Sequence, residues 1–179
     1  MALTVDSFEP VEIETAILKS LPDTEREPLN AGGWPDYIIT TAQNTVLGVS
    51  RKQGGELIGG IDACEEQLSR DLLQVDHLYL LVEGMVERAR GGAWAYKFTG
   101  DKVYRAAEPY EFGYLKYERR FYRQSWKGYK SWLSRIQEMG IGYIDTLTMD
   151  ETAEALVTLH DNAQKADTDH DTFRRLIKE

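Results

Sequence analysis

Cysteine is almost missing from this sequence, because Cys64 is the only one among 179 residues. A single cysteine excludes an internal disulfide framework and favours a reducing, cytoplasmic location. Histidine is scarce too, with only three scattered along the chain. So few soft ligands argue against a structural zinc site, and any metal bound here is expected to use oxygen ligands.

Long hydrophobic runs are also missing. No apolar stretch approaches the roughly 20 residues that span a membrane, and the N-terminus lacks the basic and apolar segments of a signal peptide. The sequence has no Gly-rich phosphate loop and no Ser/His/Asp or Cys/His pairing for nucleophilic catalysis. We therefore expect one globular domain over residues 1–165, followed by a polar C-terminal tail at 166–179.

Charge is present in quantity but is unevenly distributed. The chain carries 21 Lys and Arg against 30 Asp and Glu, a net charge of −9. Residues 101–135 hold nine basic and four acidic side chains, which is +5 and leaves −14 for the rest. A basic block on an acidic body fits phosphate contact confined to one face, whereas the plain alternative is a solvated helix face.

The basic block is also aromatic, because 13 of the 19 Phe, Trp and Tyr residues lie between Trp94 and Trp132. Unpaired bases stack on aromatic rings while Lys and Arg meet phosphates. If residues 112–133 form a helix, roughly half of these rings instead pack in the core. The candidates for DNA contact are Arg119, Arg120, Arg123, Lys127, Lys130, Tyr117, Tyr122 and Trp126.

The order of expected elements is typical of an α/β protein. Strands are predicted at 11–21, 37–41, 45–50, 77–82 and 141–146, and helices at 56–73, 125–139 and 148–163. The two strands at 37–50 form a hairpin, and residues 85–124 form a less regular aromatic and basic insertion. This pattern predicts a mixed central sheet flanked by helices.

The hairpin carries the strongest motif, a Pro-Asp step in its first strand and Ser50-Arg51-Lys52 at the end of its second. Side chains alternate along a strand, so Ser50 and Lys52 share one face and Arg51 points to the other. A three-residue turn places Asp36 opposite Ser50, with Cβ atoms roughly 5 Å apart, whereas a two-residue turn shifts the register by one. The first register gathers Asp36, Ser50 and Lys52 on one patch.

A magnesium nuclease requires such a patch. Mg²⁺ takes oxygen ligands in an octahedral array, usually one or two carboxylates with water and phosphate. The metal lowers the pKa of the attacking water, and a neighbouring lysine orients that water or stabilises developing charge. We predict Asp36 as a ligand of Mg²⁺ or Mn²⁺, Lys52 as the residue that orients or activates water, and Asp23 as a weaker candidate ligand.

The longer pattern resembles the XPF-type structure-specific endonuclease domain, a branch of the restriction-endonuclease-like PD-(D/E)xK fold. The matching segments are Asp36-Tyr37, Ser50-Arg51-Lys52-Gln53-Gly54-Gly55-Glu56, Gln67 and Leu80-Leu81-Val82-Glu83-Gly84, and Asp23-Thr24-Glu25-Arg26-Glu27 is similar to the family's Asp-x-Arg-Glu with one extra residue. The resemblance spans residues 16–163. It implies a nuclease site in which Arg51, Glu56 and Gln67 shape and support the metal-binding residues.

The sequence departs from that family at two positions. The family's Glu stands as Ser50, and its downstream Asp stands as Glu56, which keeps the charge. Some restriction endonucleases of this fold carry Ser in that slot and take a Glu from the following helix. Counting fourteen positions from Lys52 gives Glu66, whereas the helical stripe points Glu65 toward the sheet and Glu66 away from it. Both are candidates for the second metal ligand, and both could equally be ordinary surface residues of a degenerate site.

These observations predict a metal-dependent DNA endonuclease that hydrolyses phosphodiesters in branched or single-strand/double-strand junction DNA. Its compact layout would suit a phage or mobile-element protein in DNA repair or recombination. One alternative is a catalytically inactive protein of nuclease fold that binds DNA. Another is a regulatory subunit that forms a homodimer or a heterodimer with an active partner.

Overall fold

The computed structural model describes residues 3–104 and 113–165, and the side chains at 100–104 and 113–115 lie outside that description. The helices and strands are, in chain order, β1 (Leu3–Asp6), α1 (Val11–Leu18), β2 (Glu25–Glu27), β3 (Tyr37–Thr40), β4 (Val46–Gln53), α2 (Gly54–Gly59), α3 (Ile61–Asp71), β5 (His77–Glu83), β6 (Met85–Ala89), β7 (Gly92–Tyr104), β8 (Gly113–Tyr122), α4 (Trp126–Glu138), β9 (Gly142–Thr146) and α5 (Met149–Ala163). The tail predicted at 166–179 falls outside the described residues.

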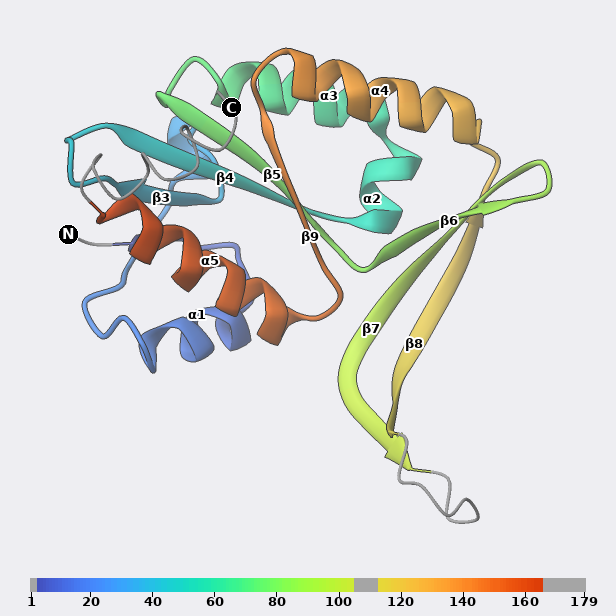
Figure 1. Ribbon diagram of the computed structural model, residues 1–179, viewed down its shortest axis with the longest axis horizontal. Coiled ribbons are helices and arrows are strands. Elements are labelled where there is room, and N and C mark those ends of the chain that lie inside the picture. Colours follow the sequence, from blue (N-terminus) through green and yellow to red (C-terminus); the bar gives the residue numbers. More distant parts are fainter. Residues whose placement is uncertain (1–2, 105–112, 166–179) are drawn as a thin grey trace, which may run out of the picture.

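A mixed sheet of six strands forms the centre of the molecule, in the order β2-β1-β3-β4-β5-β9 (Figure 1). Strands β4, β5 and β9 run parallel, whereas β3 is antiparallel to both of its neighbours. Parallel neighbours need a crossover, and helices α2 and α3 supply the one between β4 and β5. The predicted mixed sheet flanked by helices is confirmed.

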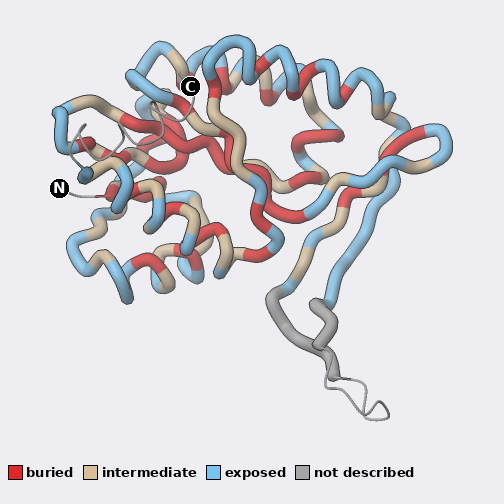
Figure 2. Tube along the Cα trace, in the orientation of Figure 1, coloured by how far each residue is buried: buried red, intermediate tan, exposed pale blue. Residues whose placement is uncertain are grey.

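Helices cover both faces of this sheet: α1 and α5 lie on one side, and α3 and α4 on the other (Figure 1). The buried residues concentrate between the sheet and these helices (Figure 2). Strand β5 contributes alternate side chains to both layers, with Leu80 in the α3/α4 core and Leu81 in the α1/α5 core. The predicted strand at 77–82 is therefore present and is buried on both faces.

The strand predicted at residues 11–21 is wrong, because this segment forms helix α1. Ile13 and Ile17, four residues apart, are its buried side chains, which is the spacing of one helical face. Acidic residues occupy its first turn, where the helix dipole favours negative charge. The first strand of the sheet is instead β1, which pairs with β3.

The helix predicted at 56–73 exists as two helices, α2 and α3, that meet at Gly60. The predicted apolar stripe is present, since Leu57, Cys64 and Leu68 are all buried. Gly60 has a backbone φ of −147°, so helical hydrogen bonding cannot continue through it. The break lets α3 begin at Ile61.

Residues 85–124 include a second sheet, in which β6, β7 and β8 form an antiparallel ribbon that projects from the body (Figure 1). The interpretation of residues 112–133 as one helix is wrong, because β8 ends at Tyr122 and α4 starts only at Trp126. Gly84 joins β5 to the ribbon with a φ of 90°, and a Cβ there would lie 2.2 Å from the Tyr96 carbonyl oxygen. Only glycine fits this junction.

No helix in the described part of the chain is both long enough and apolar enough to cross a membrane.

Candidate functional site

The β3–β4 hairpin has the register that gathers the motif residues. Tyr37 pairs with Val49 and Thr40 with Val46, which places Asp36 across from Ser50. The Thr41 N–H donates to the Thr45 carbonyl oxygen at 2.9 Å and extends the pairing by one step, which leaves a turn of three residues. In that turn Asn44 takes the left-handed conformation, with φ at 59°. The three-residue turn is therefore the one that the chain adopts.

Asp36 is buried and is held from two sides, with only 4% of its surface exposed. The Asn30 side-chain amide donates to its Oδ1 at 3.0 Å, and the Arg51 backbone N–H donates to its Oδ2 at 2.7 Å. Burial raises the pKa of Asp36 above its ordinary value, although the positive charge of Lys52 opposes that rise. The carboxylate is thus fixed in position, and burial destabilises its charged form.

Ser50 makes a contact that the motif did not indicate. Its hydroxyl donates a hydrogen bond to Asp71 Oδ2 at 2.6 Å, and both side chains are almost fully buried. Asp71 is the last residue of α3. Burial raises its pKa, and the negative charge of Asp36 raises it further. Asp36 and Asp71 therefore contact consecutive residues of β4, Arg51 through its backbone and Ser50 through its hydroxyl.

Asp71 does not follow from the family spacing, which points to Glu66 instead. A signal was available: Cys64, Leu68 and Asp71 follow the three- and four-residue steps of one helix face. A charged residue that continues an apolar stripe must be buried with it. Burial raises the pKa of the Cys64 thiol to about 11. The positive charge of Lys52 lowers this pKa, and the negative charge of Asp71 raises it.

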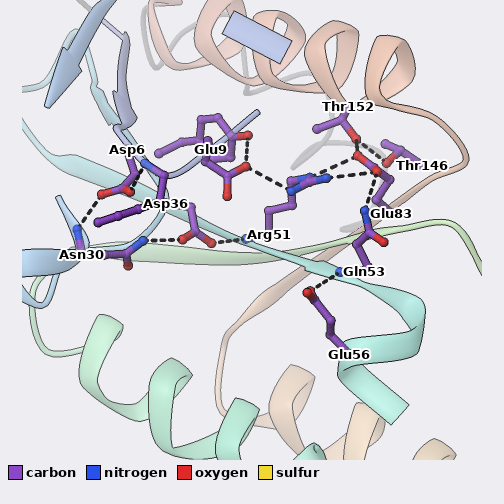
Figure 3. A network of polar contacts seen from close by, with 12 residues as sticks. Asp6, Glu9, Asn30, Asp36, Arg51, Gln53, Glu56, Glu83, Thr146 and Thr152 are labelled. Carbon is purple, nitrogen blue, oxygen red and sulfur yellow. Dashed lines mark hydrogen bonds and ion pairs between the residues drawn. The ribbon is translucent and has the colours of Figure 1, made fainter. Parts of the chain in front are cut away.

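The opposite face of β4 carries a closed ion-pair network around Arg51 (Figure 3). The Arg51 guanidinium donates from Nε to one Glu83 oxygen at 3.1 Å and from a terminal nitrogen to the other at 3.0 Å. Its remaining nitrogen lies 3.2 Å from Glu9 Oε2, which also accepts the Tyr37 hydroxyl at 2.5 Å. Burial opposes the charge on Arg51, but these two carboxylates outweigh it and raise the pKa of the guanidinium.

Glu83 links strand β4 of the central sheet to helix α5 (Figure 3). Besides Arg51 it accepts the Thr152 hydroxyl of α5 at 3.0 Å and the Gln53 side chain at 3.4 Å. Next to it, the Glu56 carboxylate accepts the Gln53 backbone N–H and so caps the first turn of α2. Arg51 and Glu56, predicted as supporting residues, hold strand and helix in place around the hairpin.

The two glutamates predicted as alternative metal ligands lie elsewhere on α3. Glu65 accepts the Trp132 ring N–H at 2.9 Å and pairs with Arg135, both on α4. The expectation that Glu65 faces the sheet is therefore wrong, because its partners lie on the neighbouring helix. Glu66 is exposed, and Gln67 is half-buried.

Asp23, the weaker candidate ligand, is exposed in the connection between α1 and β2. The N-terminal residues that reach the network are Asp6 and Glu9. Asp6 is fully buried and accepts the backbone N–H groups of Phe8 and Asn30 at 2.8 and 2.7 Å. The apolar strand that directly precedes Asp6 was the signal that could have placed it at a sheet end.

The side chains on the Ser50 face of β4 could supply part of the coordination shell of a divalent cation. Among the described residues, no three Asp, Glu, His or Cys side chains gather closely enough to form a metal site by themselves. Asp36 and Asp71 nevertheless offer carboxylate oxygens, each with more than one acceptor position. Two protein carboxylates are the usual complement for Mg²⁺, which fills its octahedron with water and phosphate oxygens.

The predicted DNA contacts separate into packed and exposed groups. Tyr122 lies against Gly55 and Gly59 of α2, and Trp126 packs on the α3/α4 core. Tyr117 is 53% exposed, the highest value among the described aromatic residues of the ribbon. The basic candidates are exposed on β8, the following loop and α4: Arg119, Arg120, Arg123, Lys127 and Lys130.

A cleft of about 390 Å³ lies between the end of β4, helix α2 and the ribbon. Gln53 and Glu56 line one wall, and Lys97, Arg120 and Tyr122 line the other. The cleft therefore joins the hairpin that carries the motif to the basic ribbon.

The central sheet, its two helical layers and the hairpin motif define an XPF-like nuclease fold. Among solved structures, the chain is similar to XPF from Aeropyrum pernix, with a TM-score of 0.62 and 18% identity over 99% of this chain and 72% of that one. It is also similar to the complex of XPF from Aeropyrum pernix with DNA, with a TM-score of 0.52 and 17% identity over 93% and 68%. No protein-family model and no curated protein sequence matches the chain.

Proposed function

We propose that this protein is a DNA endonuclease that depends on Mg²⁺ or Mn²⁺, with Asp36 and Asp71 as the protein ligands of the metal. The observation that carries the proposal is the hydrogen bond from Ser50 to Asp71. It brings a carboxylate from α3 to the strand position where the resembling family has its Glu. Asp71 thus replaces Glu65 and Glu66 as our preferred second ligand.

Each residue of this site would have a separate role. Asp36 and Asp71 would hold the metal, and the bound metal would polarise the phosphate and lower the pKa of a water. Lys52 shares their face of β4 and would orient that water or stabilise charge on the phosphate oxygens. Arg51 would be a positioning residue. Its backbone N–H donates to Asp36, and its side chain anchors the strand on the opposite face.

Hydrolysis requires one water and one phosphodiester. The water oxygen forms a bond to phosphorus while a bond to one ester oxygen breaks, and the departing oxygen ends as a hydroxyl group. The water proton leaves to solvent or to a neighbouring base. The likeness to a structure of XPF in complex with DNA supports DNA as the substrate class, and the basic ribbon beside the cleft supports branched or junction DNA over a plain duplex.

The second candidate is a protein of the same fold that binds DNA without cutting it. The observation in its favour is the burial of the site: Ser50 is fully buried, and both oxygens of Asp36 already accept hydrogen bonds. Such a protein could also act as an inactive subunit in a homodimer or a heterodimer.

A cleavage assay separates the two candidates. Splayed and four-way DNA are incubated with the protein in Mn²⁺, in Mg²⁺ and in EDTA, and binding is measured in parallel by a gel-shift assay. We expect metal-dependent nicking that Asp36→Asn, Asp71→Asn and Lys52→Met each reduce by about 10² or more. Glu66→Gln is the matched control on α3 and should leave cleavage unchanged.

Two results would count against parts of this proposal. Intact DNA binding with no cleavage at high protein concentration would favour the inactive protein. Cleavage that survives Asp71→Asn but is lost with Glu66→Gln would return the second ligand to the position that sequence spacing favoured.

A further inference from the structure

The ribbon formed by β6, β7 and β8 has two chemically different faces. On one face Ala93, Ala95 and Tyr122 join the core beside α2. Among the ribbon side chains that the structure describes, the other face carries five aromatic ones, none of which belongs to either core cluster. They are Trp94, Tyr96 and Phe98 of β7 and Tyr117 and Phe121 of β8. We call this set the ribbon aromatic face.

The rings of the ribbon aromatic face follow the ribbon as a row of two contacting groups. Trp94 meets Phe121 edge-on with centroids 5.2 Å apart, and Tyr96 and Phe98 lie 6.5 Å apart with nearly parallel planes. Tyr117 bridges the row at 5.4 Å from Tyr96 and 6.0 Å from Phe98. Strand pairing places these side chains opposite one another, so the row is built by the register.

These rings remain open to solvent although they are large and apolar. Tyr117 is 53% exposed and Phe121 38% exposed, and the three rings of β7 are half-buried. A contiguous exposed apolar patch marks an interaction site more often than chance placement. Their contacts with one another keep the rings ordered, which lowers the entropy lost on binding.

The charge of the ribbon identifies the partner. The segments 85–99 and 113–123 carry seven basic side chains and two acidic ones, so +5, which leaves −14 for the rest of the chain. Arg119 lies within the aromatic row, with its guanidinium 4.8 Å from the Trp94 ring. Rings that stack and cations beside them match a polyanion that exposes flat apolar surfaces, which describes unpaired nucleotides.

We propose that the ribbon aromatic face binds single-stranded DNA by base stacking, with Arg119 on the backbone. The inference rests on the proposed function in one respect, that the protein acts on DNA. The cleft beside Gln53 and Glu56 lies on the other, α2-facing side of the same ribbon, so the ribbon aromatic face is a binding surface separate from that cleft.

The test compares single-stranded and duplex probes in fluorescence anisotropy. The probes are a labelled oligothymidylate of about 16 nucleotides, near the upper end of known site sizes, and a blunt duplex of equal length. Tyr117→Ala and Phe98→Ala should each weaken oligothymidylate binding about five- to a hundredfold, with duplex binding unchanged. Tyr117→Phe should retain wild-type affinity because the ring is kept.

Two controls make the test specific. Phe8→Ala removes an aromatic side chain that is 80% exposed outside the ribbon, and it should change neither affinity. Oligothymidylate should also quench tryptophan fluorescence, and Trp94→Phe should remove that quenching although Trp34, Trp126 and Trp132 are retained.

Four results would overturn the inference. Unchanged oligothymidylate binding in Tyr117→Ala would refute this inference but would not affect the proposed DNA cleavage. A wild-type protein that binds neither probe would refute the proposed function as well. Equal losses for single-stranded and duplex probes would show a general electrostatic surface. A wild-type dimer that Tyr117→Ala converts to a monomer in sedimentation would assign the face to a second copy of the chain.

Discussion

The two faces of strand β4 carry buried charge in opposite ways. On one face Arg51 is matched by Glu83 and Glu9, and the hydroxyls of Thr152 and Tyr37 satisfy the same carboxylates. On the other face Asp36 and Asp71 are both buried, and Lys52 opposes the charge of each only through space. In the first cluster a cation contacts both carboxylates directly, whereas in the second Lys52 acts on the two carboxylates only through space.

This difference indicates what each cluster is for. A closed network of ion pairs ties strand, helix and N-terminal segment together and needs no further ligand. Buried carboxylates that no cation contacts directly are a feature that active sites share, because a bound metal can supply the missing charge. Substitutions on the two faces of β4 and at their partner residues test this difference.

Arg51→Met should have the largest effect on stability. It leaves Glu9 and Glu83 buried without their cation, which should lower the free energy of unfolding by about 3–5 kcal/mol. Lys52→Met is the matched control one position along the same strand, and its half-buried side chain should change stability by less than about 1 kcal/mol. Urea titration of both variants checks this, and equal losses would contradict the distinction between the two faces.

Thr152→Val should have the next largest effect. It removes the hydroxyl that donates to Glu83 at 3.0 Å, and a hydrogen bond to a buried charge is worth about 1.5–3 kcal/mol. Thr158→Val changes an exposed threonine of the same helix and should leave stability within about 0.5 kcal/mol of wild type. Thermal denaturation of the two variants measures the difference, and a similar shift in both would remove Thr152 from the network.

Asp71→Asn should stabilise the protein while impairing cleavage. It removes an unbalanced buried charge and keeps an oxygen that can accept the Ser50 hydroxyl, so we expect a gain of about 0.5–2 kcal/mol at neutral pH. A gain in stability with a loss of activity is the signature of a residue retained for function. A loss of stability would show that Asp71 serves only the fold.

The same substitution should change how stability depends on pH. The pKa of Asp71 is raised in the folded chain, so the folded state holds more protons than the unfolded state between the two pKa values. Wild-type stability in EDTA should therefore fall as pH rises from about 4 through the raised pKa of Asp71. Asp71→Asn should weaken this fall, and identical pH profiles would contradict the assignment.

Glu65→Gln should have the smallest effect. Its ion pair with Arg135 is 40% and 58% exposed on the two sides, and solvent screening limits such pairs to about 0–1 kcal/mol. The amide can still accept the Trp132 ring N–H. DNA cleavage should also be unchanged, and a loss equal to that of Asp71→Asn would show that Glu65 reaches the metal after all.

Much of this fold was predictable because local patterns and tertiary packing agree. The alternation of Tyr37–Thr40, the stripe of α3 and the apolar run of β5 each appear in the structure as predicted. Residues 11–21 were misjudged because branched apolar residues suit both strand and helix, and only packing of Ile13 and Ile17 separates the two. The ribbon was not predicted as strands, because the pairs that join its aromatic residues are distant in the sequence: Trp94 pairs with Phe121 and Phe98 with Tyr117.

The sequence by itself determined the motif, its strand alternation and the basic block on an acidic chain, because these depend on residue type and spacing alone. Only the tertiary structure decided which carboxylate meets Ser50, since Asp71 is 21 residues away and arrives there through the break at Gly60 and the length of α3. It also decided that Glu65 turns to α4 and that five aromatic rings share one open face. Contacts between distant segments follow from packing in three dimensions, which spacing along the chain does not encode.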